Sequence, residues 1–462
     1  MGIRRSDIMK VQSINPANGE VNKELEAMTD RQALDVCKAA KAASRDWREM
    51  GIDERLSRIG QFGNVLRQNK KEYARLATVE MGRLLKDAEV EVERSAEHCD
   101  LLVSNAREWL KDEVVATEYS KSVIAFEPVG TVLMIMPWNF PYSQVTRTAL
   151  PALTAGNTVV LRHSNSVPMV AQALEEAFRH AGFPENVFRS VITDHKAIAK
   201  MIRSRFIDAV AFTGSADTGK AVAKIAATGF KKCALELGGS NSFIVLRDVN
   251  LDVAAQQAVA SRIPSCGQSC SASKRFIVVE EVADEFTRKV VENTKALVVG
   301  DPSDQGTHIG PLANSQQLEK LEAQVRLAVE QGAKLECGGK RYGMRGYFYQ
   351  PTVLTGVKKS MAVMKEEVFG PVIPIIRVRN EEEALKLANA SDFGLGGSVW
   401  TADVAKGEQI ARKLNVGVTG VNRSSASDNR MPFGGMKKSG TGRDFSRYGM
   451  LEFVNIKSIM VK

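Results

Sequence analysis

Three side chains of this 462-residue chain form a set that is suited to acyl chemistry: Cys270, Glu236 and Asn139. A thiolate attacks a carbonyl carbon, an amide donates hydrogen bonds to the resulting oxyanion, and a carboxylate activates water. Taken alone, each residue has a plainer interpretation, as a small buried side chain, an ion-pair partner and a turn residue respectively. The order of their motifs along the chain favours a catalytic role over these interpretations. The motifs are Pro-Trp-Asn-Phe-Pro at 137–141, Leu-Glu-Leu-Gly-Gly at 235–239 and Gly-Gln-Ser-Cys at 267–270.

Residues 212–220, with the sequence Phe-Thr-Gly-Ser-Ala-Asp-Thr-Gly-Lys, indicate a nucleotide site. They follow a predicted strand and open a predicted helix, so free backbone N–H groups and the positive helix end would face a phosphate. The run is nearly a P-loop, but Ala221 lacks the hydroxyl that holds magnesium, which disfavours ATP chemistry. The dinucleotide fingerprint GxGxxG is absent from the sequence, and a plain strand-to-helix turn is the alternative.

Apolar strand-like runs alternate with helical stretches from residue 130 onwards. Strands are predicted at 130–137, 157–162, 187–193, 208–213 and 233–237, and helices at about 143–154, 168–182, 195–204 and 217–228. This alternation predicts βαβ units and a parallel sheet with both faces covered. A second alternating series runs from 242 to roughly 420, and residues 31–110 are expected to form long amphipathic helices.

The composition is that of an ordinary globular protein, with 44% apolar and 25% charged residues, and the length predicts two or three domains. Lys and Arg number 63 against 54 Asp and Glu, but the excess is spread along the chain, so we expect no nucleic-acid partner. The apolar runs are too short to span a bilayer, and we expect no membrane association. Six scattered cysteines and the lack of a signal peptide predict a reducing, cytoplasmic location. Cys and His show no metal-ligand spacing, so we expect no metal.

Further motifs extend the pattern over nearly the whole chain: Glu-Glu-Val-Phe-Gly-Pro at 366–371, Pro-Phe-Gly-Gly at 432–435 and Lys-Ser-Gly-Thr-Gly-Arg at 438–443. With these motifs in this order, the chain resembles the aldehyde dehydrogenase superfamily, and within it the compact bacterial succinate-semialdehyde dehydrogenases. The resemblance implies an α/β fold, with a Rossmann-like cofactor domain, an α/β catalytic domain and a small β-arm for oligomerisation.

The domain boundaries that we expect follow the same resemblance. The cofactor domain would comprise 1–117 and 136–238, the catalytic domain 239–430, and the arm 118–135 and 431–462. Because an arm strand pairs with a partner's sheet edge, a homodimer or homotetramer is expected.

The resemblance also implies a role for each catalytic residue. Cys270 would be the nucleophile that attacks an aldehyde. Its oxyanion would be held by the Asn139 amide and the backbone N–H of Cys270, and Glu236 would deprotonate the water that hydrolyses the thioester. NADP or NAD would accept the hydride.

The cofactor would be held by further residues that match the family's motifs. Glu367 matches a ligand of the nicotinamide ribose, Phe369 would line the site of the ring, and Ser215 matches a pyrophosphate contact at a helix N-terminus. The other cofactor-binding positions are Trp138, Arg162, Ser164, Asn165, Gly214 and Leu237.

The run Arg162-His163-Ser164-Asn165 departs from the family pattern, which usually has Lys at 162 and often Glu at 165. A glutamate there would bind ribose hydroxyls and repel a 2′-phosphate. Asn165 is neutral, and Arg162 can bind a phosphate through its planar guanidinium. We therefore expect NADP to be accepted, in addition to NAD or in preference to it. In the alternative, another residue fills the role of the glutamate.

Cys266 stands four residues before Cys270, where the family usually has Asn or a small residue. A disulfide between the two sulfurs would switch the enzyme off under oxidation. The alternative is a buried thiol that fills space.

The substrate would contact four residues: Gln144, Arg147, Ser269 and Ser427. In the similar succinate-semialdehyde dehydrogenases an arginine matches Arg147 and a serine precedes the cysteine, so the first candidate is succinate semialdehyde. Arg147 has an equally supported interpretation as a solvated or ion-paired surface arginine. Arg423 replaces a small residue and would reshape the mouth of the site, and lactaldehyde and glutarate semialdehyde remain alternatives.

Two other classes of protein compete with this interpretation. A CoA-acylating or phosphate-dependent semialdehyde reductase keeps the nucleophile but lacks the water-activating carboxylate, so Glu236 argues against it. A non-catalytic structural or nucleic-acid-binding protein has no need of Cys270, Asn139 and Glu236 together.

Overall fold

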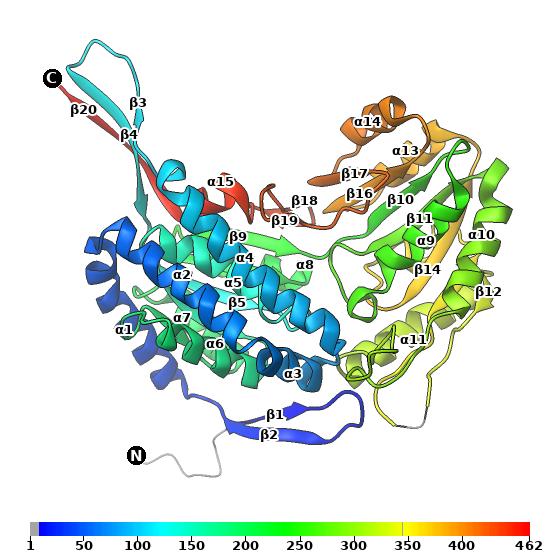
Figure 1. Ribbon diagram of the computed structural model, residues 1–462, viewed down its shortest axis with the longest axis horizontal. Coiled ribbons are helices and arrows are strands. Elements are labelled where there is room, and N and C mark those ends of the chain that lie inside the picture. Colours follow the sequence, from blue (N-terminus) through cyan, green and yellow to red (C-terminus); the bar gives the residue numbers. More distant parts are fainter. Residues whose placement is uncertain (1–8, 344) are drawn as a thin grey trace.

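The structure is a computed structural model that describes residues 9–343 and 345–462. The first eight residues of the expected cofactor domain, and Met344 of the expected catalytic domain, lie outside the described residues. Figure 1 shows two α/β bodies side by side and a narrow β-arm that projects from the first of them.

The first body is built on a six-stranded sheet with the strand order β19-β9-β8-β5-β6-β7. The strands from β9 to β7 are parallel, and β19 is antiparallel to β9. All residues of β5 and β6 are buried, as expected where helices cover both faces of a parallel sheet. The strands are β5 (Thr131–Met136), β6 (Thr158–His163), β7 (Phe188–Ser190), β8 (Ala209–Gly214), β9 (Lys232–Leu237) and β19 (Gly440–Thr441).

The helices predicted between these strands are present, with ends within two residues of the predicted ones. Side chains fix several helix starts: Asp194 accepts a hydrogen bond from the Ala197 N–H at 2.8 Å, and Thr29 and Gln32 form a capping box. The helices of this body are α1 (Asp30–Glu49), α2 (Ile52–Gln68), α3 (Lys70–Met81), α4 (Leu85–Trp109), α5 (Ser143–Thr154), α6 (Pro168–His180), α7 (His195–Arg203) and α8 (Ala216–Ala227).

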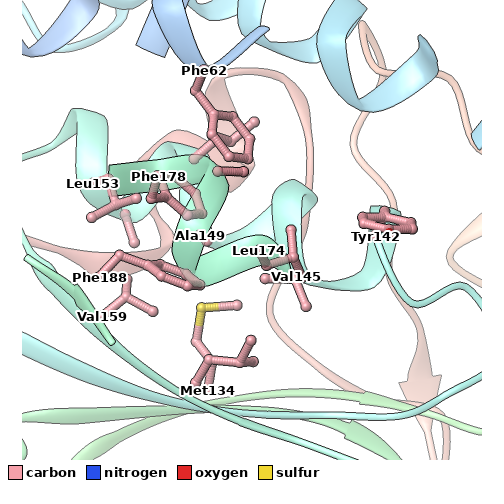
Figure 2. Close-up of a cluster of buried hydrophobic side chains, with 14 of the residues drawn as sticks. Phe62, Met134, Tyr142, Val145, Ala149, Leu153, Val159, Leu174, Phe178 and Phe188 are labelled. Carbon is pink, nitrogen blue, oxygen red and sulfur yellow. The ribbon is translucent and has the colours of Figure 1, made fainter. Parts of the chain in front are cut away.

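A core of aromatic and aliphatic side chains joins the helices to the sheet (Figure 2). Phe178 of α6 lies between Phe62 of α2 and Phe188 of β7, at ring-centroid distances of 3.9 and 4.0 Å. Met134 of β5 and Val145 of α5 belong to the same buried cluster. This packing fixes α5 over the sheet, and α5 carries two of the predicted substrate residues.

The second body contains a seven-stranded sheet with the order β12-β13-β14-β11-β10-β16-β17, parallel except for β12. It corresponds to the second alternating series of the sequence. Its strands are β10 (Asn241–Val245), β11 (Ser273–Val279), β12 (Lys334–Cys337), β13 (Thr352–Thr355), β14 (Val372–Val378), β16 (Gly396–Trp400) and β17 (Val418–Val421). Its helices are α9 (Leu251–Arg262), α10 (Glu280–Lys295), α11 (Ser315–Glu330), α12 (Ala362–Lys365), α13 (Glu381–Asn389) and α14 (Val404–Lys413).

The arm is a three-stranded sheet of β3 (Glu113–Val114), β4 (Lys121–Pro128) and β20 (Val454–Val461), with β4 in the centre. Two segments that we expected to belong to the arm, 131–135 and 431–453, lie outside its sheet. Residues 131–135 belong to β5, because an apolar run buried on both faces requires the central sheet. Within 431–453, β19 pairs with β9, and β18 (Met436–Lys437) pairs with β15 (Phe393–Gly394), so these residues join the two bodies.

The remaining elements are short. They are the hairpin β1 (Lys10–Ile14) and β2 (Val21–Glu26), the helix α15 (Ser446–Met450), and the 3-10 helices η2 (Pro264–Gly267) and η3 (Leu451–Phe453). Within residues 9–343 and 345–462, no helix has the length and apolarity to cross a membrane.

Candidate active site

Cys270 lies between η2 and β11, at the point where two cavities meet. One cavity, of about 240 Å³, lies at the carboxyl ends of β5, β8 and β9, and the other, of about 360 Å³, lies along α4 and α5. Cys270 and Gln144 line both cavities. The carboxyl end of a parallel sheet is the usual ligand site of such folds. A ligand in each cavity would therefore reach the same sulfur atom.

Hydrogen bonds to the backbone hold Cys270 in place. Its carbonyl oxygen accepts from Asn241 Nδ2 at 2.9 Å and from Lys274 Nζ at 2.8 Å. Arg262 is fully buried, and its Nη1 donates at 3.4 Å to the carbonyl oxygen of Gly267, three residues before Cys270. None of these three anchors could be recognised from the sequence, because each acts through a backbone oxygen that only the folded loop brings near.

The charges around Cys270 decide how readily its thiol ionises. Burial raises the pKa of the thiol, and the positive charges of Arg147 and Lys274 oppose that rise. The negative charges of Glu236 and Glu367 add to it. The thiol is therefore protonated near neutrality, and its attack on a carbonyl requires transfer of the proton to a base.

Glu236, near the end of β9, is a buried carboxylate that borders the cavity at the carboxyl ends of β5, β8 and β9. Within the described ranges neither of its carboxylate oxygens has a hydrogen-bond partner. Burial raises the pKa of Glu236 well above its ordinary 4.5; the charge of Asp444 adds to the rise, and Arg147 and Arg443 oppose it. A buried, unpartnered carboxylate with a raised pKa is suited to take a proton from water near neutral pH.

Asn139 is buried and lines the same cavity as Cys270. Its Nδ2 donates to the Gln268 carbonyl at 3.0 Å, and its Oδ1 accepts from Gln144 Nε2 at 3.5 Å. The amide NH₂ has two hydrogens, so one N–H can still be donated to an oxyanion. The structure therefore brings Asn139, Glu236 and Cys270 together on one cavity.

The cavity at the carboxyl ends of the strands contains six of the predicted cofactor positions: Trp138, Gly214, Ser215, Leu237, Glu367 and Phe369. The Trp138 and Phe369 rings meet edge to face, with centroids 5.8 Å apart. Ser215 begins α8 by accepting from the Thr218 N–H at 3.3 Å. A methyl group on Gly238 would lie 2.1 Å from the Glu367 carboxylate, so only glycine lets that carboxylate reach this wall. A helix start, two aromatic rings and a carboxylate fit a dinucleotide.

Arg162, Ser164 and Asn165 lie instead at and just after the carboxyl end of β6, and they do not line this cavity. Arg162 is buried and donates from Nη2 to the Thr193 carbonyl at 3.2 Å. Arg162 Nε and Asn165 Oδ1 are buried without a hydrogen-bond partner in the part of the chain that the structure describes.

The cavity along α4 and α5 brings together all four predicted substrate residues: Gln144, Arg147, Ser269 and Ser427. Arg147 is not a free cation, because its Nε lies 2.7 Å from Asp444 Oδ2 and both side chains are buried. Arg147 is therefore ion-paired but not a surface residue, and since it lines the cavity, its contact with the substrate stays a prediction. Asp444 carries no motif that distinguishes it, and sequence reasoning missed it.

Cys266 does not face Cys270 across a cavity. It packs with Ile244 and other apolar side chains in a core cluster of the second body, and burial raises the pKa of its thiol to about 12. Both cysteines are free thiols.

We therefore expect Cys266→Ala to lose activity in hydrogen peroxide at the same rate as the unchanged protein. The reason is that a buried, protonated thiol is a poor partner for an oxidised cysteine. Residual activity is measured against time, before and after dithiothreitol. Dithiothreitol-reversible inactivation that is present in the unchanged protein and absent from the variant would establish the disulfide switch instead.

A thiol, a buried carboxylate and an amide on one cavity are suited to an enzyme that oxidises a carbonyl compound through a covalent thioester. The sequence pattern of the aldehyde dehydrogenase family matches residues 3–459, and the chain belongs to this family. Figure 1 shows the two α/β bodies and the arm as the resemblance implied.

Relatives of named function span nearly the whole chain. It is 41% identical to a succinate semialdehyde dehydrogenase of Escherichia coli named for NAD(P)+, over 97% of each chain. It is 38% identical to a succinate-semialdehyde dehydrogenase of Deinococcus radiodurans named for NADP+, over 97% of this chain and 94% of the other. The solved succinic semialdehyde dehydrogenase of Streptococcus pyogenes with NADP+ superposes with a TM-score of 0.95 at 33% identity, covering 98% and 99%. The predicted family, fold class and enzyme class, an NAD(P)-dependent aldehyde dehydrogenase, are confirmed.

Proposed function

We propose that the protein oxidises succinate semialdehyde to succinate, with NADP or NAD as the acceptor. One observation carries the proposal: Cys270 borders both cavities, so a substrate along α4 and α5 and a nicotinamide beside Phe369 would meet at its sulfur. The names of the similar relatives support the choice of aldehyde. The buried carboxylate of Glu236 favours hydrolysis of the thioester over transfer to CoA.

The residues would act in a fixed order. Cys270 transfers its thiol proton to water as its Sγ attacks the aldehyde carbon, and the oxyanion accepts hydrogen bonds from Asn139 Nδ2 and the Cys270 N–H. When bound, the dinucleotide supplies the acceptor that oxidises this adduct to a thioester. Glu236 then takes a proton from water, which attacks the thioester carbon. Glu236 passes this proton to Cys270 Sγ as the C–S bond breaks, so the acid is released and Cys270 regains its thiol.

A panel of aldehydes tests the proposal, with the reduced nicotinamide followed by absorbance. We expect kcat/KM for succinate semialdehyde to exceed that for butanal and lactaldehyde by about tenfold or more, since a site built to pair a charged group rejects substrates that lack it. We expect about the same advantage over glutarate semialdehyde, which keeps the carboxylate but is longer by one methylene. A higher kcat/KM for any of the other three would overturn the choice of substrate. A rate that requires CoA would overturn hydrolysis.

The cofactor preference is tested at position 165. We expect Asn165→Glu to lower kcat/KM for NADP relative to NAD by about tenfold or more, because two negative charges in contact repel each other. Both cofactors are assayed with the unchanged protein and with Asn165→Gln, which adds length without charge. An equal response of the glutamate and glutamine variants would contradict this role of position 165. A hundredfold preference of the unchanged protein for NAD would contradict acceptance of NADP.

The pH dependence of kcat tests Glu236 as the general base, because it reports the pH at which that carboxyl ionises. Glu236 must be ionised to accept a proton, and its pKa is raised above 4.5, so kcat should fall as pH drops through that raised value and level off above it. Asp444→Asn removes a negative charge that raises this pKa and leaves Arg147 without its partner. The acid limb should therefore move to lower pH. Asp392→Asn, which removes an exposed carboxylate paired with Lys438, should leave it in place. If the acid limb of kcat stays at the same pH in Asp444→Asn, Glu236 is not the base that the profile reports.

The arm supports an oligomer. β20 and β3 are the edges of its sheet, and β20 exposes Ile456 and Met460 at 64% and 61%. Exposed apolar residues on an edge strand are suited to pairing with another subunit. We propose a homodimer or homotetramer in the cytoplasm, and light scattering would distinguish the two states.

A further inference from the structure

The loop 137–142, which joins β5 to α5, carries Asn139 and has prolines at positions 137 and 141. Proline has no N–H, so this loop has fewer backbone donors and is held largely through its carbonyl oxygens. The Phe140 carbonyl oxygen accepts from the Gln144 N–H at 2.9 Å, which joins the loop to the start of α5. The orientation of the Asn139 amide depends on what holds the other carbonyl oxygens.

His163 holds the carbonyl oxygen of Pro141 from the neighbouring strand. It is the last residue of β6 and lies opposite Met136, the last residue of β5. Its Nε2 lies 2.9 Å from the Pro141 carbonyl oxygen, and the side chain is 2% exposed. This bond is shorter than the one that Ser265 donates to the Asn139 carbonyl oxygen, at 3.4 Å. His163 therefore ties the loop to the central sheet.

The second ring nitrogen decides which tautomer His163 adopts. The Ser164 N–H donates to His163 Nδ1 at 3.0 Å, and the Met136 carbonyl oxygen lies farther from Nδ1, at 3.2 Å. Nδ1 is thus the acceptor and carries no hydrogen, so the hydrogen of the neutral ring is on Nε2. Burial lowers the pKa of His163 to about 4, which keeps the ring neutral near pH 7. Nε2–H is therefore a permanent donor to the Pro141 carbonyl oxygen.

The same loop aims the Asn139 amide at the reacting centre. One N–H of Asn139 is donated to the carbonyl oxygen of Gln268, two residues before Cys270, and the other is left for the oxyanion. Such a donor acts only when it is already aimed at the place where the charge develops. A misplacement of about 1 Å can cost about a hundredfold in rate. Loss of the bond to Pro141, two residues after Asn139, would free the loop to move by such a distance.

We propose that His163 is a positioning residue for Asn139: its bond to the Pro141 carbonyl oxygen holds the amide in line with the oxyanion on Cys270. This role rests on the proposed function, in which Asn139 stabilises that oxyanion. His163 lines neither of the two cavities that meet at Cys270, so it acts through the loop and not by contact with substrate or cofactor. In the alternative, His163 only fills the core at the end of β6.

Two substitutions separate the two ring nitrogens. The amide nitrogen of glutamine is as many bonds from Cα as Nε2 is, so His163→Gln can still donate to the Pro141 carbonyl oxygen. The asparagine amide reaches only as far as Nδ1, so His163→Asn leaves that oxygen without its donor. Rapid mixing with succinate semialdehyde and NADP measures the rate constant of nicotinamide reduction in the first turnover. We expect His163→Asn to lower it by about tenfold to a hundredfold, and His163→Gln by less than about threefold.

The binding constants should not follow this rate. The aldehyde concentration that gives half the maximal rate, and Kd for NADP by calorimetry, should change by less than about twofold in both variants, because an interaction made only in the transition state is lost. A smaller folded fraction would lower the amplitude of the first turnover and not its rate constant. His163→Met, which fills the volume of the ring but donates no hydrogen bond, replaces His163→Asn if the latter does not fold, and the same loss is expected.

A double-mutant cycle with Asn139→Ala decides whether His163 acts through this amide. Asn139→Ala alone should lower the rate constant by about 10²–10³-fold. In that background His163→Asn should cost less than about twofold more, because no amide is left to position. An equal loss in both backgrounds, or an unchanged rate constant in His163→Asn alone, would overturn the proposal. If Asn139→Ala keeps the full rate, the oxyanion role in the proposed function fails, and the positioning role fails with it.

The matched control is His180→Asn. His180 is exposed at the end of α6, away from the loop 137–142, and its imidazole lies beside Arg179. The same change of side chain at this position should leave the first-turnover rate constant and Kd for NADP unchanged. A loss there as large as in His163→Asn would also overturn the proposal, because it would show that the effect does not depend on the bond to Pro141.

Discussion

Cys270→Ala should abolish aldehyde oxidation, with a loss of at least about 10⁴-fold in kcat, because removal of a covalent nucleophile leaves only binding and oxyanion stabilisation. The side chain makes no hydrogen bond within residues 9–343 and 345–462, and the loop is held through the Cys270 carbonyl oxygen. The variant should therefore fold, and it should still bind the cofactor, as measured with NADP by calorimetry or with NADPH by its fluorescence.

The matched control for this experiment is Cys266→Ala, which removes a thiol of the same segment from an apolar core. It should retain most of its kcat, at some cost in stability. Comparable activity in Cys270→Ala and the unchanged protein would contradict the assignment of the nucleophile. A loss of equal size in both cysteine variants, with both folded, would show that the segment rather than the sulfur matters.

Glu236→Gln should separate the two halves of the reaction. Loss of a general base typically lowers a rate by about 10²–10⁴-fold, and here the affected step is hydrolysis of the thioester. The substitution keeps the size of a side chain that is 7% exposed, so the cavity keeps its shape. Reduced nicotinamide should therefore appear in a rapid burst of one equivalent per active site, followed by slow turnover.

Rapid mixing with excess succinate semialdehyde measures the burst, with the unchanged protein as the comparison. A single slow phase with no burst in Glu236→Gln would mean that the carboxylate is needed before the nicotinamide is reduced. Glu236 would then be the base for the Cys270 thiol, and its proposed role in hydrolysis would be wrong.

The regular parts of the fold could be predicted from local sequence patterns. The run at 130–137 and its partners are apolar because both faces of the sheet are covered, so strand and helix positions follow from the alternation of short apolar runs with amphipathic stretches. The ends of the arm could not be predicted in this way. Residues 440 and 441 form a strand only because they pair with β9, more than 200 positions earlier in the chain.

Sequence motifs pointed to Cys270 and Glu236, and the structure places both on one cavity, while their roles stay predictions. The ion pair between Arg147 and Asp444 could not be predicted, since it joins positions almost 300 residues apart.

The most direct test of Cys270 as the nucleophile is to trap the acyl group on the protein. Glu236→Gln is mixed with succinate semialdehyde and NADP, quenched in acid, digested and analysed by mass spectrometry. We expect one succinyl group per chain, carried by the peptide that contains Cys270 and absent when NADP is omitted. A succinyl group on any other residue, or full reduction of NADP with no acylated peptide, would contradict it.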